Sequence, residues 1–155
     1  MRGPRSMGLL TGFIVLATAA CEPDAELEAP ATTEGPDKEV LVEGGQLPYS
    51  PVVQSGNLLF LSGIIGVDQD ADDQGTPAET RRVLEDIEET LGEVGASMDD
   101  AVKCTVFLID MDDFSDMNEV YAEFFPEDPP ARSTVAVDAL PGGAEVEIEC
   151  IAAAP

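Results

Sequence analysis

Alternating positions or short apolar runs predict strands in five stretches of the chain. They are residues 39–43, 58–61, 102–109, 134–138 and 145–152. A period of two, as in 39–43 and 145–152, is typical of a half-buried strand, and a short apolar run such as 58–61 is consistent with a fully buried one. Ser55-Gly56-Asn57, just before the second stretch, has the composition of a hairpin turn. Pro48-Tyr49-Ser50-Pro51 predicts an irregular segment, because proline restricts its own backbone and that of the preceding residue.

Two longer stretches have the spacing of amphipathic helices. The first runs from Thr76 to Gly95, with Thr76 expected as the N-cap, Pro77 at the first helical position and Glu79 completing a capping box. Its apolar stripe consists of Val83, Leu84, Ile87, Leu91 and Val94. The second helix begins at Asp112 or Asp113 and ends at Pro126, with a stripe of Phe114, Met117, Tyr121 and Phe124. Asn118 lies off that stripe.

The order β-β-α-β-α-β-β predicts an α/β (α+β) fold, in which a mixed β-sheet carries two helices packed on one face. Two helices of this length cover one face only. The stretch 102–109 is apolar on both faces, so burial of the other face against a second subunit is expected. We therefore expect an oligomer whose sheets face inward.

The first 38 residues differ in composition from the rest. Residues 1–20 combine two arginines, an apolar run and small residues, which is typical of a signal peptide. Leu16 to Cys21 resembles a lipoprotein cleavage site, with Cys21 as the lipidated residue, although Thr18 stands where a leucine is usual; a plain secretory signal is the alternative. Residues 21–38 are an acidic, Pro-rich linker, and residues 39–155 form one domain. The prediction is an exported cell-envelope or periplasmic protein that is anchored to a membrane by the lipid on Cys21.

The composition excludes several classes of function. The chain has 32 acidic residues, seven basic residues and no histidine, for a formal net charge of −25. Such a charge repels nucleic acid, and the absence of histidine removes Cys–His and Ser–His catalysis and histidine-ligated metals. No cofactor motif or metal-ligand cluster is present, so no cofactor and no metal are expected. Cys104 and Cys150 are either an oxidised pair in an exported protein or small buried hydrophobes.

The candidate catalytic and binding side chains lie mainly in the segment from Pro129 to Ile151. This segment is expected to form two strands around a Pro-Gly-Gly turn. Arg132 begins the first strand and can bind a carboxylate through two hydrogen bonds; a salt bridge with a local acid such as Asp128 is the alternative. Glu145, Glu147 and Glu149 share one face of the second strand, opposite Val146, Ile148 and Cys150. Glu147, mid-strand, is the candidate general base.

These segments together resemble the Rid (YjgF) family of enamine/imine deaminases. The resemblance covers residues 39–153 and rests on LPYSPVVQSGNLLFLSG, TRRVLEDIEETL, KCTVFLIDMDDFSDMNEVYAEFF, PARSTVAV and EVEIECIA. It implies a chorismate-mutase-like fold, a homotrimer with clefts between subunits, and hydrolysis of 2-enamines and 2-imino acids to 2-oxo acids and ammonia. The partner would be a small anionic imino or oxo acid.

The resemblance also implies roles for individual residues. Arg132 would bind the substrate carboxylate, Glu147 would activate water, and Tyr49, Ser62 and Asn118 would be polar residues of the cleft. Thr134 stands where many members have cysteine, and its main-chain groups would still bind substrate. Ile64 replaces a common glutamine. Two alternatives remain: a non-catalytic small-carboxylate-binding module on the same scaffold, and a structural envelope lipoprotein.

Overall fold

The computed structural model describes residues 37–46 and 48–155. The expected signal peptide, Cys21 as the lipidation site, and the linker up to residue 36 lie outside the described residues. Among the helices within residues 37–46 and 48–155, none combines the length and apolar character needed to cross a membrane.

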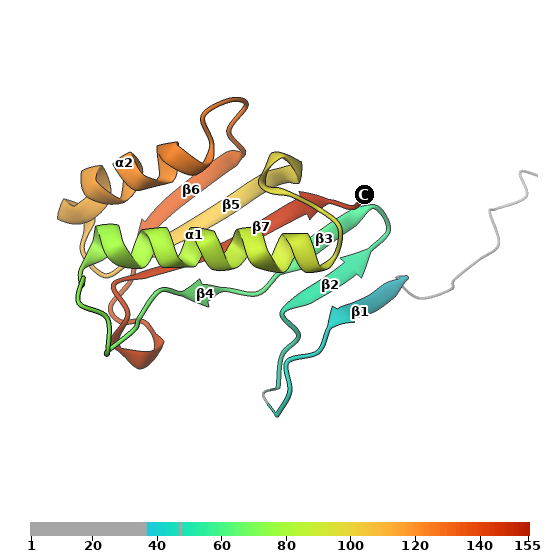
Figure 1. Ribbon diagram of the computed structural model, residues 1–155, viewed down its shortest axis with the longest axis horizontal. Coiled ribbons are helices and arrows are strands. Elements are labelled where there is room, and N and C mark those ends of the chain that lie inside the picture. The colour runs from blue at the N-terminus through green and yellow to red at the C-terminus, as the bar shows by residue number, and fades with distance from the viewer. Residues whose placement is uncertain (1–36, 47) are drawn as a thin grey trace, which may run out of the picture. The chain divides into compact units, whose positions relative to one another are not determined.

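A mixed sheet forms the centre of the domain (Figure 1). Its strands are β1 (Lys38–Val42), β2 (Val52–Ser55), β3 (Leu58–Leu61), β4 (Ile64–Ile65), β5 (Ala101–Leu108), β6 (Ala131–Ala136) and β7 (Val146–Ala153). Their order is β1-β2-β3-β7-β5-β6, and β4 also pairs with β7. β5 and β6 are parallel, whereas the other pairs are antiparallel. The predicted α+β fold with a mixed sheet is confirmed.

Both helices, α1 (Thr76–Glu93) and α2 (Phe114–Phe124), lie on the same face of this sheet (Figure 1). The expected stripe of α1 is buried from Val83 to Leu91, and its apolar side chains meet the buried faces of β5 and β7 in one core. The stripe of α2 is only partly as predicted. Met117 and Tyr121 are buried, but Phe114 is 39% exposed and Phe124 is only partly buried, while Phe125, after the helix, is buried.

Two strands were not expected from the pattern, β2 and β4. β2 pairs with β3 through a hairpin at Ser55-Gly56-Asn57, where Gly56 has a φ of 61°. The turn prediction is therefore confirmed, and the strand that precedes it is a finding of the structure. β2 has only four residues and directly follows Pro51, which explains why the pattern did not identify it.

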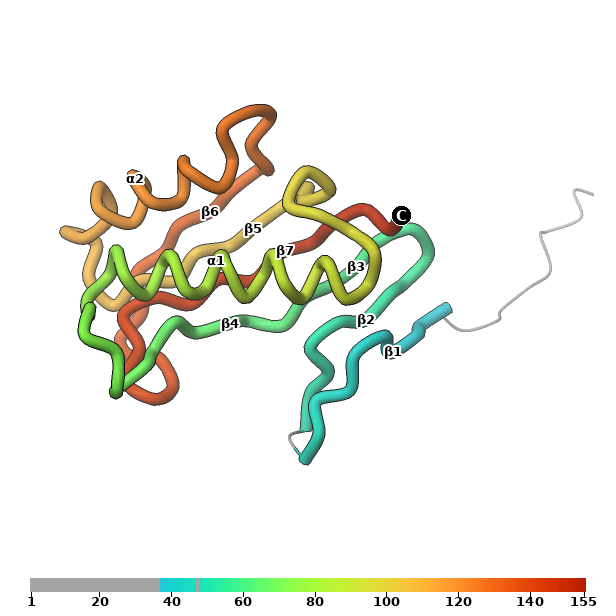
Figure 2. Tube along the Cα trace, viewed as in Figure 1, coloured from blue at the N-terminus to red at the C-terminus, as the bar shows by residue number. Residues whose placement is uncertain are grey.

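The Pro-Gly-Gly segment is not a hairpin turn. It forms a short 3-10 helix, η3 (Pro141–Gly143), on a connection that carries the chain from β6 to β7. These two strands do not pair, because β5 lies between them. Figure 2 shows the connection looping beyond the end of the sheet before the chain returns as β7. Arg132 and the glutamates of β7 are consequently two strands apart.

The predicted capping box at the start of α1 is wrong. Gly75 is the N-cap and no side chain caps the helix. Thr76 and Glu79 are instead buried in tertiary contacts. Glu79 accepts hydrogen bonds from the backbone N–H groups of Glu145 (2.7 Å) and Val146 (3.2 Å), which secures the start of β7 to the helix.

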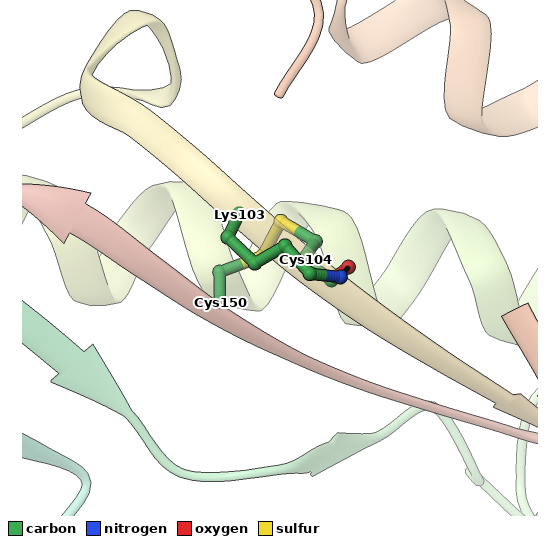
Figure 3. The surroundings of a disulfide bond; sticks show 3 residues. All are labelled: Lys103, Cys104 and Cys150. Atoms are coloured by element: carbon green, nitrogen blue, oxygen red, sulfur yellow. Dashed lines mark hydrogen bonds between the residues drawn. A yellow bond between two sulfur atoms is a disulfide. The ribbon is translucent and has the colours of Figure 1, made fainter. Parts of the chain in front are cut away.

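Cys104 of β5 and Cys150 of β7 form a disulfide bond across directly paired positions of the two strands (Figure 3). Their Cα atoms are 4.1 Å apart, and both side chains are buried in the core beneath the helices. Of the two interpretations left open by the sequence, the structure has the oxidised pair. Lys103, beside the bond, donates from Nζ to the Cys104 carbonyl (2.8 Å) and to Ser133 Oγ of β6 (3.0 Å).

Candidate functional site

Arg132 lies at the start of β6 and points toward α2. Its register partner on β5 is Cys104, whose side chain is on the helix-covered face, so Arg132 is directed to the same side. Its guanidinium carbon is 4.5 Å from the ring centroid of Tyr121 and 5.7 Å from that of Phe114. Arg132 Nη2 donates to Asn118 Oδ1 at 2.6 Å. Two aromatic faces and one amide therefore fix the orientation of the guanidinium.

No carboxylate forms an ion pair with Arg132 in the part of the chain that the structure describes. The alternative of a salt bridge with Asp128 is therefore not found. A guanidinium has five N–H donors, and only the bond to Asn118 is present among the described residues. The others remain available for an incoming carboxylate, which arginine binds through two parallel hydrogen bonds.

Arg132 and Asn118 line a cavity of about 290 Å³ between the C-terminal half of α2 and the beginning of β6. Its remaining walls come from Tyr121, Ala122, Phe125, Pro129 and Pro130. Tyr121 is 4% exposed, and its hydroxyl has no hydrogen-bond partner among the described residues. Burial raises the pKa of Tyr121 to about 12, although the nearby Arg132 charge opposes the rise. The phenol is therefore neutral at physiological pH.

A second group of predicted residues surrounds a different cavity, of about 270 Å³, lined by Tyr49, Pro51, Ser62, Gly63, Ile64 and Ile65. Tyr49 is 52% exposed. Ser62 Oγ donates to the carbonyl of Ser50 at 2.8 Å, and Ser62 N–H donates to the carbonyl of Pro51 at 2.9 Å. The hydroxyl of Ser62 thus holds the irregular segment beside the cavity in place.

Glu147 belongs to this second group. It lies on β7 opposite Ile65 of β4, and its carboxylate packs so closely on Gly63 that a Cβ at that position would overlap it. Burial raises the pKa of Glu147, and the neighbouring Glu149 carboxylate raises it further. A carboxylate with a raised pKa beside a cavity has the properties of a general base.

The other two glutamates of this segment behave differently from each other. Glu149 is exposed on the uncovered face of the sheet, as expected. The prediction that Glu145 shares this face is wrong, because its carboxylate lies at the start of α1, where the Thr76 hydroxyl is 3.1 Å from Glu145 Oε2 and 2.8 Å from Asp113 Oδ2. Glu145 precedes β7, so the alternation of the strand does not extend to it.

Within one chain, the predicted site residues form two separate groups. Arg132 and Asn118 lie on the helix-covered side, and Thr134, two residues after Arg132 on β6, shares their face of the strand. Glu147 alternates with the buried Val146 and Ile148, so it lies on the opposite face of the sheet. Tyr49 and Ser62 line the cavity beside Glu147. One chain does not bring the guanidinium and the candidate base together.

Tyr121 and Phe114 were predicted only as apolar positions of the second helix. Their contacts with Arg132 are a finding of the structure. The prediction that Asn118 lies off the stripe of Phe114 and Tyr121 is wrong, since the three residues are spaced four and three positions apart and therefore fall on one helix face, where all three contact Arg132. The sequence did not indicate that Arg132 would pack on that face. No group of three or more acidic or cysteine side chains suited to a metal ion occurs within residues 37–46 and 48–155.

The chain matches a family model described as endoribonuclease L-PSP over residues 44–154. Similar proteins include a RutC family protein of Pyrococcus abyssi, 45% identical over 108 residues, covering 68% of this chain and 85% of the relative. The chloroplastic Reactive Intermediate Deaminase A of Arabidopsis thaliana is 43% identical over 113 residues, covering 68% of this chain and 58% of the relative. The 2-iminobutanoate/2-iminopropanoate deaminase of Mus musculus is 39% identical over 108 residues, covering 68% and 80%.

Solved structures have the same fold. The Rid family protein YyfA of Yersinia pestis is 36% identical with a TM-score of 0.68, covering 75% of this chain and 98% of that protein. The yeast protein YEO7_yeast is 37% identical with a TM-score of 0.67, covering 74% of this chain and 94% of that protein.

Proposed function

Because the chain belongs to the endoribonuclease L-PSP (Rid) family, we propose that it hydrolyses 2-imino acids and 2-enamine acids to 2-oxo acids and ammonia. Two of its relatives are named for deaminase activity. The observation that carries the proposal is the state of Arg132, which is oriented by Tyr121 and Asn118 and has no carboxylate partner among the described residues. A small acid is the natural ligand for such a group.

The reaction needs few groups, because an imine carbon is already electrophilic. Arg132 holds the carboxylate and orients C2 of the substrate. Glu147 accepts a proton from water as the water oxygen bonds to C2 and the C=N π electrons move to nitrogen, and its carboxyl returns that proton to the nitrogen to give a carbinolamine. Glu147 then takes the proton of the new hydroxyl and passes it to the amine nitrogen as the C=O bond forms, the C–N bond breaks and ammonia leaves. The raised pKa of Glu147 suits both transfers.

The proposal requires a second subunit, because Arg132 and Glu147 are on opposite faces of the sheet in one chain. We place the complete site in clefts between the subunits of a homotrimer. The uncovered face of the sheet supports such an assembly. It presents two apolar pairs of register partners, Phe60 with Ile151 and Phe107 with Val135, and Phe60 and Val135 are 39% and 41% exposed. Exposed apolar surface of this kind is typical of subunit interfaces.

The family is described as an endoribonuclease family, but the composition argues against RNA as the substrate of this chain. Seven basic residues stand against 32 acidic ones, whereas RNA binding relies on arginine and lysine contacts to phosphates. The sequence also contains no histidine that could act as a general base or acid. We therefore assign the chemistry to a small anionic imino acid.

We propose further that the protein is exported and attached to the cell envelope through a lipid on Cys21. The N-terminal pattern of residues 1–21 motivates this. The Cys104–Cys150 disulfide agrees with it, since disulfides persist in oxidising compartments. Replacing Cys21 with serine and fractionating the cells tests the anchor; membrane association that is unchanged in Cys21→Ser contradicts it.

A second candidate function is a silent carboxylate-binding module on the same scaffold. It is favoured by Ile64, an apolar side chain in the cavity beside Glu147, where it offers water no hydrogen bond. Such a protein would bind 2-oxo acids through Arg132 without turning over imines. Thermal shift with 2-oxobutanoate, measured beside the activity assay, separates the two functions.

The decisive experiment measures imine loss in a coupled amino-acid oxidase assay. Arg132→Ala is expected to lower kcat/KM about 100-fold or more, since hydrogen bonds to charged groups contribute about 1.5–3 kcal/mol each. Glu147→Gln is expected to lower kcat by about 100-fold or more. Arg81→Ala is the matched control, because Arg81 forms an exposed ion pair with Glu123 away from both cavities. Wild-type activity no greater than that of Arg132→Ala contradicts the deaminase proposal.

A further inference from the structure

The cavity beside Arg132 is larger and more apolar than binding of a carboxylate requires. Its volume is about 290 Å³, while a water-sized group occupies roughly 30 Å³. Apart from Arg132 and Asn118, its walls are aromatic rings, prolines and Ala122. A methyl or ethyl side chain would leave most of this space unfilled.

The position of the guanidinium determines which part of a bound acid reaches the cavity. The guanidinium carbon of Arg132 is 4.5 Å from the ring centroid of Tyr121, and Arg132 Nη2 donates a hydrogen bond to Asn118 Oδ1 at 2.6 Å. All three side chains line the cavity. An acid whose carboxylate meets the free N–H groups of Arg132 therefore has C2 at the edge of the cavity. The substituent on C2 is then the group that can extend along Tyr121 and Phe125.

Charge in the cavity restricts the chemistry of that substituent. Arg132 is the only charged side chain among the residues that line it, and in the proposed reaction it is occupied by the carboxylate. Tyr121 is neutral because its pKa is about 12. A cationic substituent would be repelled by Arg132, and a polar one would lose its hydration against apolar walls. An apolar substituent gains from burial.

We propose that this cavity is the side-chain pocket of the substrate site, and that the protein prefers 2-imino acids with extended apolar side chains. The inference rests on the proposed deaminase function and adds the substrate class to it. Each methylene buried in the pocket is expected to raise kcat/KM about fourfold. The imine derived from norleucine should therefore be hydrolysed about 60-fold more efficiently than the imine derived from alanine.

Ala122 provides the variant that tests the pocket. It is an exposed helical residue that lines the cavity, so Ala122→Leu fills space with little cost to the helix. The matched control is Glu119→Leu, which adds the same side chain to an exposed position of α2 outside the cavity lining. Ala122→Leu should lower kcat/KM for the norleucine-derived imine at least tenfold more than it lowers kcat/KM for 2-iminopropanoate, so that the preference for the longer substrate is lost. Glu119→Leu should leave both values unchanged.

The same three proteins are titrated calorimetrically with 2-oxopropanoate and 2-oxohexanoate, so that the pocket is tested independently of turnover. The pocket is supported if the wild type binds the longer acid more tightly and if this preference is lost in Ala122→Leu and kept in Glu119→Leu. This holds even if no imine is hydrolysed, because the absence of hydrolysis would count against the deaminase function alone. Hydrolysis and binding that do not depend on chain length, or a dependence that survives in Ala122→Leu, would overturn the pocket while leaving the deaminase function standing.

Discussion

Removal of the Cys104–Cys150 disulfide should destabilise the domain strongly. The bond joins residues separated by 46 positions, and the closed loop contains all of α2 and β6, including Arg132. In the chain-entropy account, a cross-link restricts the unfolded chain, and a loop of 46 residues gives about 4 kcal/mol at 25 °C. For a domain of this size, that corresponds to a decrease in Tm of roughly 10–20 °C.

The disulfide bond can be removed by chemical reduction or by substitution of both cysteines, and we would compare the two. Because both cysteines are buried, the bond is reduced by unfolding the protein with reductant and refolding it, with a mass increase of about 2 Da as the check. The variant Cys104→Ala/Cys150→Ala removes the bond permanently but also deletes two buried sulfur atoms, which leaves a small cavity. Reduced wild type isolates the effect of the cross-link. Cys21→Ser serves as the background for all samples, so that no other cysteine is present.

Urea unfolding followed by circular dichroism, at one protomer concentration, gives the free energy of unfolding for each form. We expect the reduced protein to lose about 2–4 kcal/mol and its m-value to rise, because the unfolded chain expands without the link. Equal unfolding midpoints for samples whose masses confirm the oxidised and reduced states would refute the loop-closure argument.

Substitutions at three further positions test separate contacts. The pKa of Tyr121 is raised to about 12 in the folded protein, so the unfolded chain releases the phenol proton first as pH rises. The free energy of unfolding of the wild type should therefore fall by about 2–3 kcal/mol between pH 10 and pH 12, and Tyr121→Phe should remove this fall in urea titrations at the two pH values. Glu79→Ala should lower the free energy of unfolding by about 2–4 kcal/mol in urea titrations, because two backbone N–H groups lose their acceptor, whereas Glu79→Gln keeps an acceptor oxygen and should lose less. Gly63→Ala should reduce imine hydrolysis nearly as much as Glu147→Gln with little change in Tm, because the added Cβ displaces the Glu147 carboxylate; full activity in Gly63→Ala would argue against the observed position of Glu147.

The sequence predicted the helices and the general architecture well, since these follow from periodic burial. Val83, Leu84, Ile87 and Leu91 occupy the core face that their spacing indicates. Contacts between distant segments were not predicted. Glu79 matched a local capping motif, but its carboxylate bonds instead to the start of β7, 66 residues away. The burial of a polar side chain by tertiary contacts has no signature in local spacing.

In the candidate site, too, individual residues were predicted from the sequence, whereas the contacts between distant segments were not. Arg132 was identified because basic residues are rare in the chain, and Asn118 is its hydrogen-bond partner. The pairing of Arg132 with Tyr121 depends on a parallel β5–β6 pair that places β6 beneath α2, and strand order cannot be read from alternation. The two turn-separated strands near the C-terminus suggested adjacency, yet β5 lies between them.

β6, the strand that carries Arg132, lies at an edge of the sheet and, among the described strands, is hydrogen-bonded to β5 alone. Edge segments with a single ladder open locally at a lower free energy than central strands. Its attachment also depends on Arg132 itself, whose contacts with Asn118 and Tyr121 join β6 to α2. Anything bound by the guanidinium therefore also restrains the strand, and the affinity for an acid includes the free energy of closing this edge. Amide exchange along residues 131–136 would report occupancy of the cleft.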